Sequence, residues 1–294
     1  MMRSSQSETA DREFPLTDLL SPDAYPLAGR NAGREQTLIE LEGSDLGGGG
    51  FTIIAGPCAV ESYEQYSETA NLIIKHSLKL IRGGAFKPRT SPYSFDGLRQ
   101  EGLDIIARVK NETGVLSVTE LMSAEDISAV VPVADIVQVG SRNMQNFPLL
   151  RAVGGIGKPV LLKRGFGNTL RELLMAAEHI MKAGNSQVIL CERGIRTFDS
   201  SQRNTLDLMA VPILQSITHL PVILDPSHSV GTPRFIPAAV RAALAVGADG
   251  VIVEVHPQPE KALSDGAQSL SPGDFSAMME DITALAHAIG RSIG

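Results

Sequence analysis

The sequence predicts a single (β/α)8 barrel, and three observations lead to that fold class. Short apolar segments alternate with longer helical stretches over about 240 residues, beginning near position 51. The chain is 43% hydrophobic but only 4% aromatic, with no Trp, and an aliphatic core suits the continuous apolar runs of buried parallel strands. No GxGxxG motif follows a strand, and a doubly wound sheet would have fewer strands, so that fold is disfavoured.

The region before the barrel is predicted to have two parts. Residues 1–36 are polar and lack a clear periodicity, so we expect a flexible N-terminal extension. Segment 37–43 (TLIELEG) alternates like a short strand, and four glycines at 47–50 form a turn into 51–56 (FTIIAG). We therefore expect a small hairpin that leads into the barrel, and we place the catalytic domain at residues 37–294.

The barrel elements follow in order. Eight strands are predicted at 51–55, 78–82, 115–120, 136–140, 159–163, 186–191, 221–225 and 250–255. Eight helical stretches are predicted at 62–75, 97–111, 123–131, 146–152, 169–183, 202–218, 234–246 and 272–289. Asn168 and Thr169 suit the N-terminal cap of the fifth helix.

Charge and cysteine content narrow the class of protein. The net charge is −7 without long basic runs, so a nucleic-acid surface is not expected. The two cysteines form no CxxC pair, which favours a reducing compartment. No apolar run approaches the ~20 residues of a membrane span, and the first residues do not resemble a secretory signal. We expect a cytoplasmic protein without membrane contact.

Charged side chains follow seven of the eight predicted strands. In a (β/α)8 barrel the active site lies at the C-terminal ends of the strands, so these side chains should converge. One group is cationic and consists of Arg82, Lys87, Arg89, Arg142, Lys163 and Arg193. Six cations in one barrel mouth repel one another unless anions neutralise them. The pattern predicts binding of more than one phosphate or carboxylate group.

A second group combines a thiol, an imidazole and two carboxylates, in Cys58, His228, Glu254 and Asp265. These are the ligands of a divalent metal, and mixed N, O and S ligation leaves Zn, Mn, Fe and Co open. Taken singly, a Cys at a strand end is often a small buried hydrophobe, and we assign Cys191 to that class. His256 stays undecided, because strand alternation turns it away from Glu254. The coincidence of both groups at one end of one barrel favours a site.

Several long segments resemble the type Iβ synthases of 3-deoxy-D-arabino-heptulosonate 7-phosphate (DAHP). They are GPCAVES (56–62), LIRGGAFKPRTSPYSFDG (80–97), GSRNMQNF (140–147), PVLLKRGF (159–166), ILCERGIRTF (189–198), DPSHSVGTP (225–233) and VEVHPQPEKALSDGAQSL (253–270). The resemblance runs from about residue 37 to 290 and supports the same barrel. Two departures are visible: Ser141 replaces an expected Ala, and the loop after Ser229 is shorter.

The resemblance implies a role for each matching residue. Metal ligation is implied for Cys58, His228, Glu254 and Asp265, with one divalent ion per subunit, manganese among the candidates. Binding of phosphoenolpyruvate is implied for Arg82, Lys87, Arg142, Lys163 and Arg193, and binding of the phosphosugar for Arg89 and Thr90. Glu120 and Asp225 match acidic residues near the reacting carbons, and we add Lys87, as a general acid by hypothesis, and His228 to the expected catalytic group. A homotetramer is the assembly that the family implies.

The function implied is the condensation of phosphoenolpyruvate with erythrose 4-phosphate, the first step of the shikimate pathway. The nearest alternative is synthesis of 3-deoxy-D-manno-octulosonate 8-phosphate (KDO8P) from arabinose 5-phosphate, since those synthases share the barrel. The sequence KPRT at 87–90 argues against it, because KDO8P synthases resemble KANR there. An aldolase that forms a Schiff base on Lys163 is a rival chemistry, disfavoured by the cations around that residue. A non-catalytic sugar-phosphate sensor would not need both residue groups intact.

Overall fold

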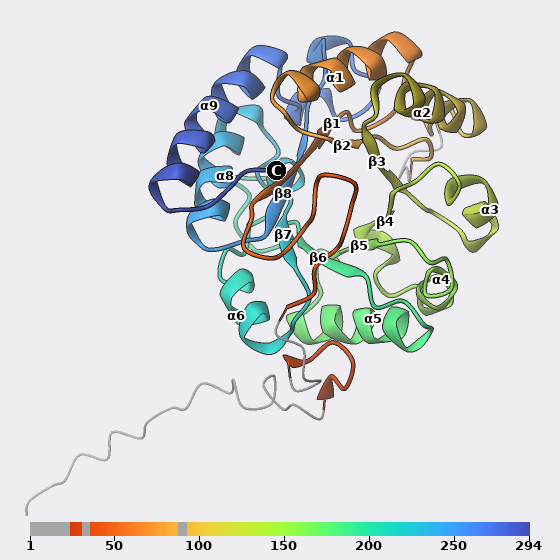
Figure 1. The fold of residues 1–294 in the computed structure, drawn as a ribbon, viewed down its shortest axis with the longest axis vertical. Helices are drawn as coiled ribbons and strands as arrows, with labels where there is room; N and C mark the ends of the chain where they lie inside the picture. Colours follow the sequence, from red (N-terminus) through yellow and green to blue (C-terminus); the bar gives the residue numbers. More distant parts are fainter. Residues whose placement is uncertain (1–23, 31–35, 88–92) are drawn as a thin grey trace, which may run out of the picture.

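A closed parallel barrel of eight strands forms the centre of the molecule (Figure 1). The computed structural model describes residues 24–30, 36–87 and 93–294. Strands β1 to β8 pair in sequence order, and β8 pairs with β1 through five residue pairs from Thr52–Gly250 to Gly56–Glu254. The helices lie outside the ring of strands. The predicted (β/α)8 barrel is therefore confirmed.

The strands are β1 (Thr52–Gly56), β2 (Leu80–Arg82), β3 (Leu116–Glu120), β4 (Ile136–Val139), β5 (Val160–Lys163), β6 (Val188–Glu192), β7 (Val222–Leu224) and β8 (Gly250–Glu254). The α-helices are α1 (Tyr63–Lys75), α2 (Gln100–Thr113), α3 (Ile127–Val130), α4 (Phe147–Val153), α5 (Leu170–Lys182), α6 (Ala210–Ile217), α7 (Pro226–Val230), α8 (Ile236–Ala245) and α9 (Pro272–Ala288). Each predicted strand overlaps an observed one.

Three helices differ from the sequence prediction. Helix α6 begins at Ala210 rather than at residue 202, because an antiparallel bridge between Ile195 and Thr205 holds the preceding segment as a loop. Helix α3 is a single turn, extended at its start by a 3-10 turn. Helix α7 was not expected and begins directly after β7, where the Asp225 side chain accepts a hydrogen bond from the His228 N–H. This turn places His228 over the barrel mouth.

Local sequence explains how α5 begins. Thr169 is its N-cap, and its hydroxyl accepts from the Glu172 N–H while the Glu172 carboxylate accepts from the Thr169 N–H. This reciprocal pair is a capping box, and it satisfies two backbone donors that the first turn leaves without partners. The cap fixes the end of the loop that follows β5 at the barrel mouth.

Apolar side chains fill the barrel from within and cover it from outside. The inner cluster takes one or two residues from each strand, namely Ile54, Leu80, Val118, Ile136, Leu161, Ile189, Cys191, Ile223 and Ile252. Cys191 is fully buried there, as expected of a structural residue. A larger cluster lies between the strands and the surrounding helices. The barrel is thus solid below its mouth, and ligands can enter only from an end.

A hairpin closes the N-terminal end of the barrel. Residues 36–50 cross this end in Figure 1, and Ile39 and Leu46 pack against the inner cluster. The hairpin pairs Ile39 with Leu46, whereas the sequence suggested pairing with 51–56; that segment instead forms β1 between β2 and β8. Because this end is plugged, the site must lie at the C-terminal end.

Part of the predicted N-terminal extension is packed. In the described segment 24–30, Tyr25 and Ala28 are buried, and the Leu27 and Ala28 N–H groups donate to Glu178 of α5. This described segment thus packs on the barrel through a buried side chain and two hydrogen bonds. Residues 1–23 and 31–35 lie outside the described residues.

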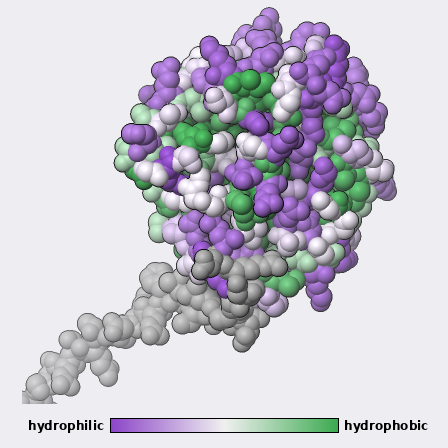
Figure 2. All heavy atoms as spheres, viewed as in Figure 1, coloured by the Kyte–Doolittle hydropathy of each residue, from purple (hydrophilic) through white to green (hydrophobic). Residues whose placement is uncertain are grey.

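The surface turned to the viewer in Figure 2 is largely hydrophilic, with smaller apolar areas between the polar side chains. The long apolar runs of the sequence are instead buried in the strands. Across the described ranges, no helix combines the length and the apolar character needed to cross a bilayer.

Candidate active site and metal centre

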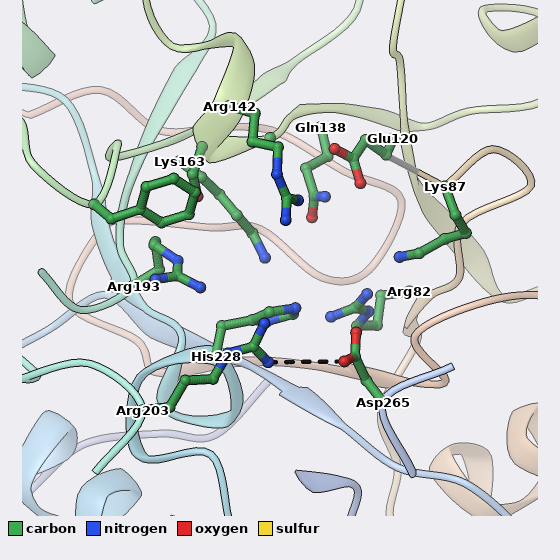
Figure 3. Close-up of a pocket in the computed structure, with 13 residues that line it drawn as sticks. Arg82, Lys87, Glu120, Gln138, Arg142, Lys163, Arg193, Arg203, His228 and Asp265 are labelled. Atoms are coloured by element: carbon green, nitrogen blue, oxygen red, sulfur yellow. Dashed lines mark ion pairs between the residues drawn. The ribbon is translucent and has the colours of Figure 1, made fainter. Parts of the chain in front are cut away.

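One cavity opens at the C-terminal end of the barrel, and side chains from most of the strand ends point into it (Figure 3). Its lining residues are Arg82, Lys87, Glu120, Gln138, Gly140, Ser141, Arg142, Lys163, Phe166, Arg193, Arg203, His228 and Asp265. The sequence predicts eight of these as site residues, namely Arg82, Lys87, Glu120, Arg142, Lys163, Arg193, His228 and Asp265. The cavity therefore unites the cations with part of the expected metal site.

Two of the cavity's cations are fixed by buried carboxylates. Lys163 Nζ donates to Asp225 Oδ2 at 2.5 Å, and Arg82 Nη1 lies 3.1 Å from Glu254 Oε1. All four side chains are almost completely buried. Burial would raise the pKa of Asp225, but the charges of His228 and Lys163 hold that pKa well below its usual range. Lys163 and Arg82 thus have set positions before any ligand binds.

Three further cations have no carboxylate partner within the described ranges. Lys87 Nζ donates to the Cys58 carbonyl at 3.1 Å, and Arg193 Nη1 donates to the Gly194 carbonyl at 3.3 Å. Arg142 is exposed at the mouth of the cavity. Burial lowers the pKa of Arg193 from its ordinary value, and the charge of Asp225 offsets only part of that effect. An anionic ligand would supply the missing negative charge.

A phenyl ring lies among the arginines. The guanidinium carbons of Arg142, Arg193 and Arg196 lie 5.9, 5.1 and 5.0 Å from the centre of the Phe166 ring. These distances fall within the range of cation–π attraction. The Arg196 N–H also donates to the Phe166 carbonyl at 2.7 Å, which ties the loops after β5 and β6 together. Phe166 thereby supports one cationic wall of the cavity.

Glu120 is the carboxylate at the end of β3, and it is only 8% exposed. It pairs in register with Gln138 of β4, and both side chains point into the cavity. A Cβ atom on Gly140 would lie 2.1 Å from Glu120 Oε1, so only glycine leaves room for this carboxylate. Burial by itself would lower the pKa of Lys87, but the nearby Cys58 and Glu120 outweigh it and raise that pKa. Lys87 is therefore a protonated amine beside Glu120.

The four predicted metal ligands lie together. Cys58 follows β1, His228 is in α7, Glu254 ends β8, and Asp265 lies in the loop after β8 with a left-handed φ of 54°. One candidate ligand atom from each residue lies within 4.8 Å of the others. Cys58 Sγ donates to Asp265 Oδ2 at 3.0 Å, so the thiol and the carboxylate already share a hydrogen bond. The arrangement fits one ion with N, O and S ligands.

The orientation of His228 also fits a metal ligand. Its Nδ1 lies 2.8 Å from Asp225 Oδ2, and its Nε2 lies 3.4 Å from Glu254 Oε1. Burial outweighs both carboxylates and lowers the pKa of His228, which favours the neutral ring. With the proton on Nδ1 bonded to Asp225, the Nε2 lone pair faces the cluster. Such a carboxylate behind the ring is the usual support of a metal-bound imidazole.

Glu254 and Cys58 supply a further test of the metal site. Glu254 Oε1 is buried and has no hydrogen bond to any residue that the structure describes; its contact with Arg82 lacks hydrogen-bond geometry. A buried carboxylate oxygen without a donor is costly unless a cation meets it. Burial, reinforced by Glu254, raises the pKa of Cys58 to about 12. A bound metal would replace the thiol proton, which is how metals stabilise a buried thiolate.

The other predicted residues fall into three groups. Asp225 does not line the cavity but lies behind Lys163 and His228, which it holds. Arg89 and Thr90 lie outside the described residues. His256 is buried and contacts Glu61, with 3.4 Å between its Nε2 and the carboxylate oxygen, so it is not part of the metal cluster. The predicted cation and metal groups otherwise converge.

Sequence reasoning missed some residues of the site. Gln138 lies two positions before the end of the predicted fourth strand, where alternation could have placed it inside. Phe166 closes the quoted segment PVLLKRGF but carries no charge to mark it. Arg203 lies within a predicted helix that is a loop in the structure, so no strand end pointed to it. Gln268 is buried next to the metal cluster.

The fold and site define a class: a (β/α)8 enzyme whose barrel mouth combines a cationic cavity with four side chains that could hold a metal ion. Comparison with known families is more specific. The chain matches the DAHP synthetase I family over residues 36–289. It belongs to that family, which confirms the resemblance predicted from its motifs.

Individual relatives agree. The chain is 51% identical over 283 residues to the phospho-2-dehydro-3-deoxyheptonate aldolase of Thermotoga maritima, covering 96% of this chain and 83% of that protein. The crystal structure of a T. maritima phospho-2-dehydro-3-deoxyheptonate aldolase (DAHP synthase) matches with a TM-score of 0.90 and 50% identity, covering 92% and 79% of the two chains. A 2-dehydro-3-deoxyphosphooctonate aldolase of Desulfosudis oleivorans is 31% identical, over 87% of this chain and 98% of that protein. The KDO8P alternative is therefore less supported.

Proposed function

We propose that this DAHP synthase condenses phosphoenolpyruvate with erythrose 4-phosphate and water, giving DAHP and inorganic phosphate, and that it requires one divalent metal ion per subunit. Carbon 3 of phosphoenolpyruvate forms a bond to the aldehyde carbon, whose oxygen takes up a proton. Water adds at carbon 2, and phosphate leaves as its bond from oxygen to carbon 2 breaks. The observation that carries this proposal is the cationic cavity directly beside the four-residue metal cluster.

Phosphoenolpyruvate carries a phosphate and a carboxylate, and the cavity offers cations for both. Lys163, Arg142 and Arg193 lie on one side, while Arg82 and Lys87 lie on the other (Figure 3). We assign the phosphate to the first group and the carboxylate to the second, because two separate cationic walls fit the two ends of one small dianion or trianion. This geometry would hold carbon 3 toward the open mouth.

The metal would be held by Cys58, His228, Glu254 and Asp265. When bound, such an ion polarises an aldehyde oxygen or lowers the pKa of a water molecule. Lys87 is protonated and lines the same cavity as Asp265, so it can donate a proton to the aldehyde oxygen. Glu120 lines the same cavity, where its carboxylate can orient or accept a proton from the water that adds at carbon 2.

The rival Schiff-base chemistry loses support at Lys163. A Schiff base needs a free amine that faces the substrate carbonyl. Here the Lys163 amine donates to Asp225 at 2.5 Å, and both side chains are buried. Lys163 is thus held as a charged partner of Asp225 and of an incoming anion.

A single assay tests the proposal. Phosphate release from phosphoenolpyruvate is measured with erythrose 4-phosphate or arabinose 5-phosphate, each with and without a chelator. We expect rapid release with erythrose 4-phosphate, which stops on chelation and returns with Mn²⁺ or Zn²⁺. A clear preference for arabinose 5-phosphate would instead identify a KDO8P synthase, and full activity after complete demetallation would exclude the metal role.

Assembly and location are further parts of the proposal. We propose a homotetramer, as the family resemblance implies, in the cytoplasm, where phosphorylated sugars are available. Exposed apolar side chains such as Phe198, Met209 and Phe235 offer surface that a second subunit could cover. We propose no nucleic-acid or membrane partner.

A further inference from the structure

Gln268 connects the metal cluster to a loop from another part of the barrel. It ends a short 3-10 turn three residues after Asp265 and is only 3% exposed. Its Nε2 donates to Glu254 Oε2 at 2.5 Å, and its Oε1 accepts from Arg203 Nη1. The amide therefore uses both of its ends: one holds a candidate metal ligand, and the other holds an arginine.

Arg203 belongs to the loop between β6 and α6, and the same loop reaches two more candidate ligands. Arg203 Nη1 lies 3.7 Å from Asp265 Oδ1, the ion pair drawn in Figure 3. The next residue, Asn204, donates its Nδ2 to the His228 carbonyl at 3.0 Å. Through Gln268, the loop is also connected to Glu254. Three of the four candidate ligands are thus connected to one loop.

Glu254 needs such a connection because Arg82 competes for it. Arg82 Nη1 lies 3.1 Å from Glu254 Oε1, and the buried Nε and Nη1 atoms of Arg82 have no hydrogen-bond partner among residues 24–30, 36–87 and 93–294. A carboxylate free to rotate would turn to form a two-bond pair with this guanidinium. Gln268 prevents the rotation by holding Oε2, which leaves Oε1 directed at His228 Nε2, 3.4 Å away.

We propose that Gln268 and Arg203 are positioning residues that hold Glu254 and Asp265 in place for the metal ion. The inference rests on the proposed metal site and adds to it that metal affinity depends on a residue of the β6–α6 loop. Residues that hydrogen-bond to metal ligands typically contribute 10- to 100-fold to metal affinity, because they order the ligand side chain before the metal binds. Gln268 contacts the ligand itself, so its loss should have the larger effect.

The test is Mn²⁺ affinity without substrates, measured by chelator competition on the purified chain. Gln268→Met keeps the length of the side chain and removes the amide, and we expect a Kd about 10- to 100-fold weaker. Arg203→Ala should weaken Mn²⁺ roughly 3- to 10-fold, and Arg203→Lys less, since the ammonium still reaches Gln268 or Asp265. Matched controls are Gln145→Ala and Arg241→Ala, which alter exposed residues bonded to Glu172 and Asp281.

Additional measurements distinguish a failure of the proposed metal site from a failure of the positioning role. The absorption of the Co²⁺-loaded chain reports thiolate ligation by Cys58, and Cys58→Ser should remove it. If the wild type binds neither Mn²⁺ nor Co²⁺, both the proposed metal site and the positioning role are refuted. If the wild type binds metal but Gln268→Met and Arg203→Ala bind Mn²⁺ as tightly, only the positioning role is overturned. Should Gln268→Met not fold, the two Arg203 variants test the positioning role, because Arg203 is 42% exposed. The role then requires that Arg203→Lys bind Mn²⁺ more tightly than Arg203→Ala.

Discussion

Arg142 should contribute to phosphoenolpyruvate binding without contributing to folding. Its guanidinium is exposed at the cavity mouth and has no carboxylate partner in the described part of the chain. Arg142→Ala therefore leaves no buried charge alone, and the free energy of unfolding should change by no more than ~0.5 kcal/mol. The whole effect should be visible in anion binding.

The size of that effect follows from the neighbours. A hydrogen bond to a charged group contributes about 1.5–3 kcal/mol. Because Lys163 and Arg193 remain in the cavity and keep part of the attraction, we expect a loss of ~2 kcal/mol, or roughly 30-fold in the Kd for phosphoenolpyruvate. The KM for erythrose 4-phosphate should change little. Isothermal titration with phosphoenolpyruvate measures the first quantity, and steady-state kinetics measures the second.

Lys163→Met provides the contrast. This change leaves Asp225 buried without its amine partner, and breaking a buried pair typically costs on the order of 3 kcal/mol. At 2–4 °C per kcal/mol, Tm should fall by roughly 6–12 °C, together with weaker phosphoenolpyruvate binding. Arg151→Ala, an exposed arginine of α4, serves as the control. The reasoning is refuted if Arg142→Ala binds phosphoenolpyruvate within twofold of the wild type, or if it lowers Tm as much as Lys163→Met.

Four further predictions concern the metal, the sugar site, the room that Gly140 leaves for Glu120, and the assembly. EDTA should abolish turnover and Mn²⁺ or Zn²⁺ should restore it, as an activity assay on metal-free protein will show; persistent activity would contradict it. Arg89→Ala should raise the KM for erythrose 4-phosphate roughly 30- to 1000-fold and that for phosphoenolpyruvate far less, because in the sequence Arg89 follows the second predicted strand by seven residues whereas Arg82 ends it; equal effects would remove the distinction between two anion sites. Gly140→Ala should reduce kcat at least tenfold with little change in Tm, since its Cβ would lie 2.1 Å from Glu120 Oε1 and displace that carboxylate; unchanged kcat would show that Glu120 tolerates the shift. Light scattering at micromolar concentration should give the mass of a tetramer, and a monomer would exclude it.

The barrel could be predicted because its signals are local. Each strand is a short apolar run between helical stretches, and the order of such runs is sufficient to indicate a parallel barrel. The strand ends then identify the site, since the fold brings all of them to one face. Lys163 and Glu120 were found for this reason, since each ends its predicted strand; Glu254 lies one residue before the predicted end and is the last residue of β8 in the structure.

The start of α6 shows where local signals mislead. Residues 202–209 continue a pattern that suits a helix, yet the bridge between Ile195 and Thr205 holds them as a loop. That loop carries Arg203 to the cavity. A bridge of this kind depends on where the ends of β5 and β6 bring the backbone, and periodicity does not report it.

The sequence by itself determined the fold class, through the order of its apolar runs, and the family, through its long motifs. It also predicted which residues form the cation and metal groups, most of them from residue type at a strand end. Only the tertiary structure decided how these groups are connected. It shows that Asp225 holds both Lys163 and His228. It also shows that Gln268 bonds to both Glu254 and Arg203, the latter 65 residues away in the sequence. Such contacts arise where loops from different strands meet, and their geometry depends on the packing of the whole barrel.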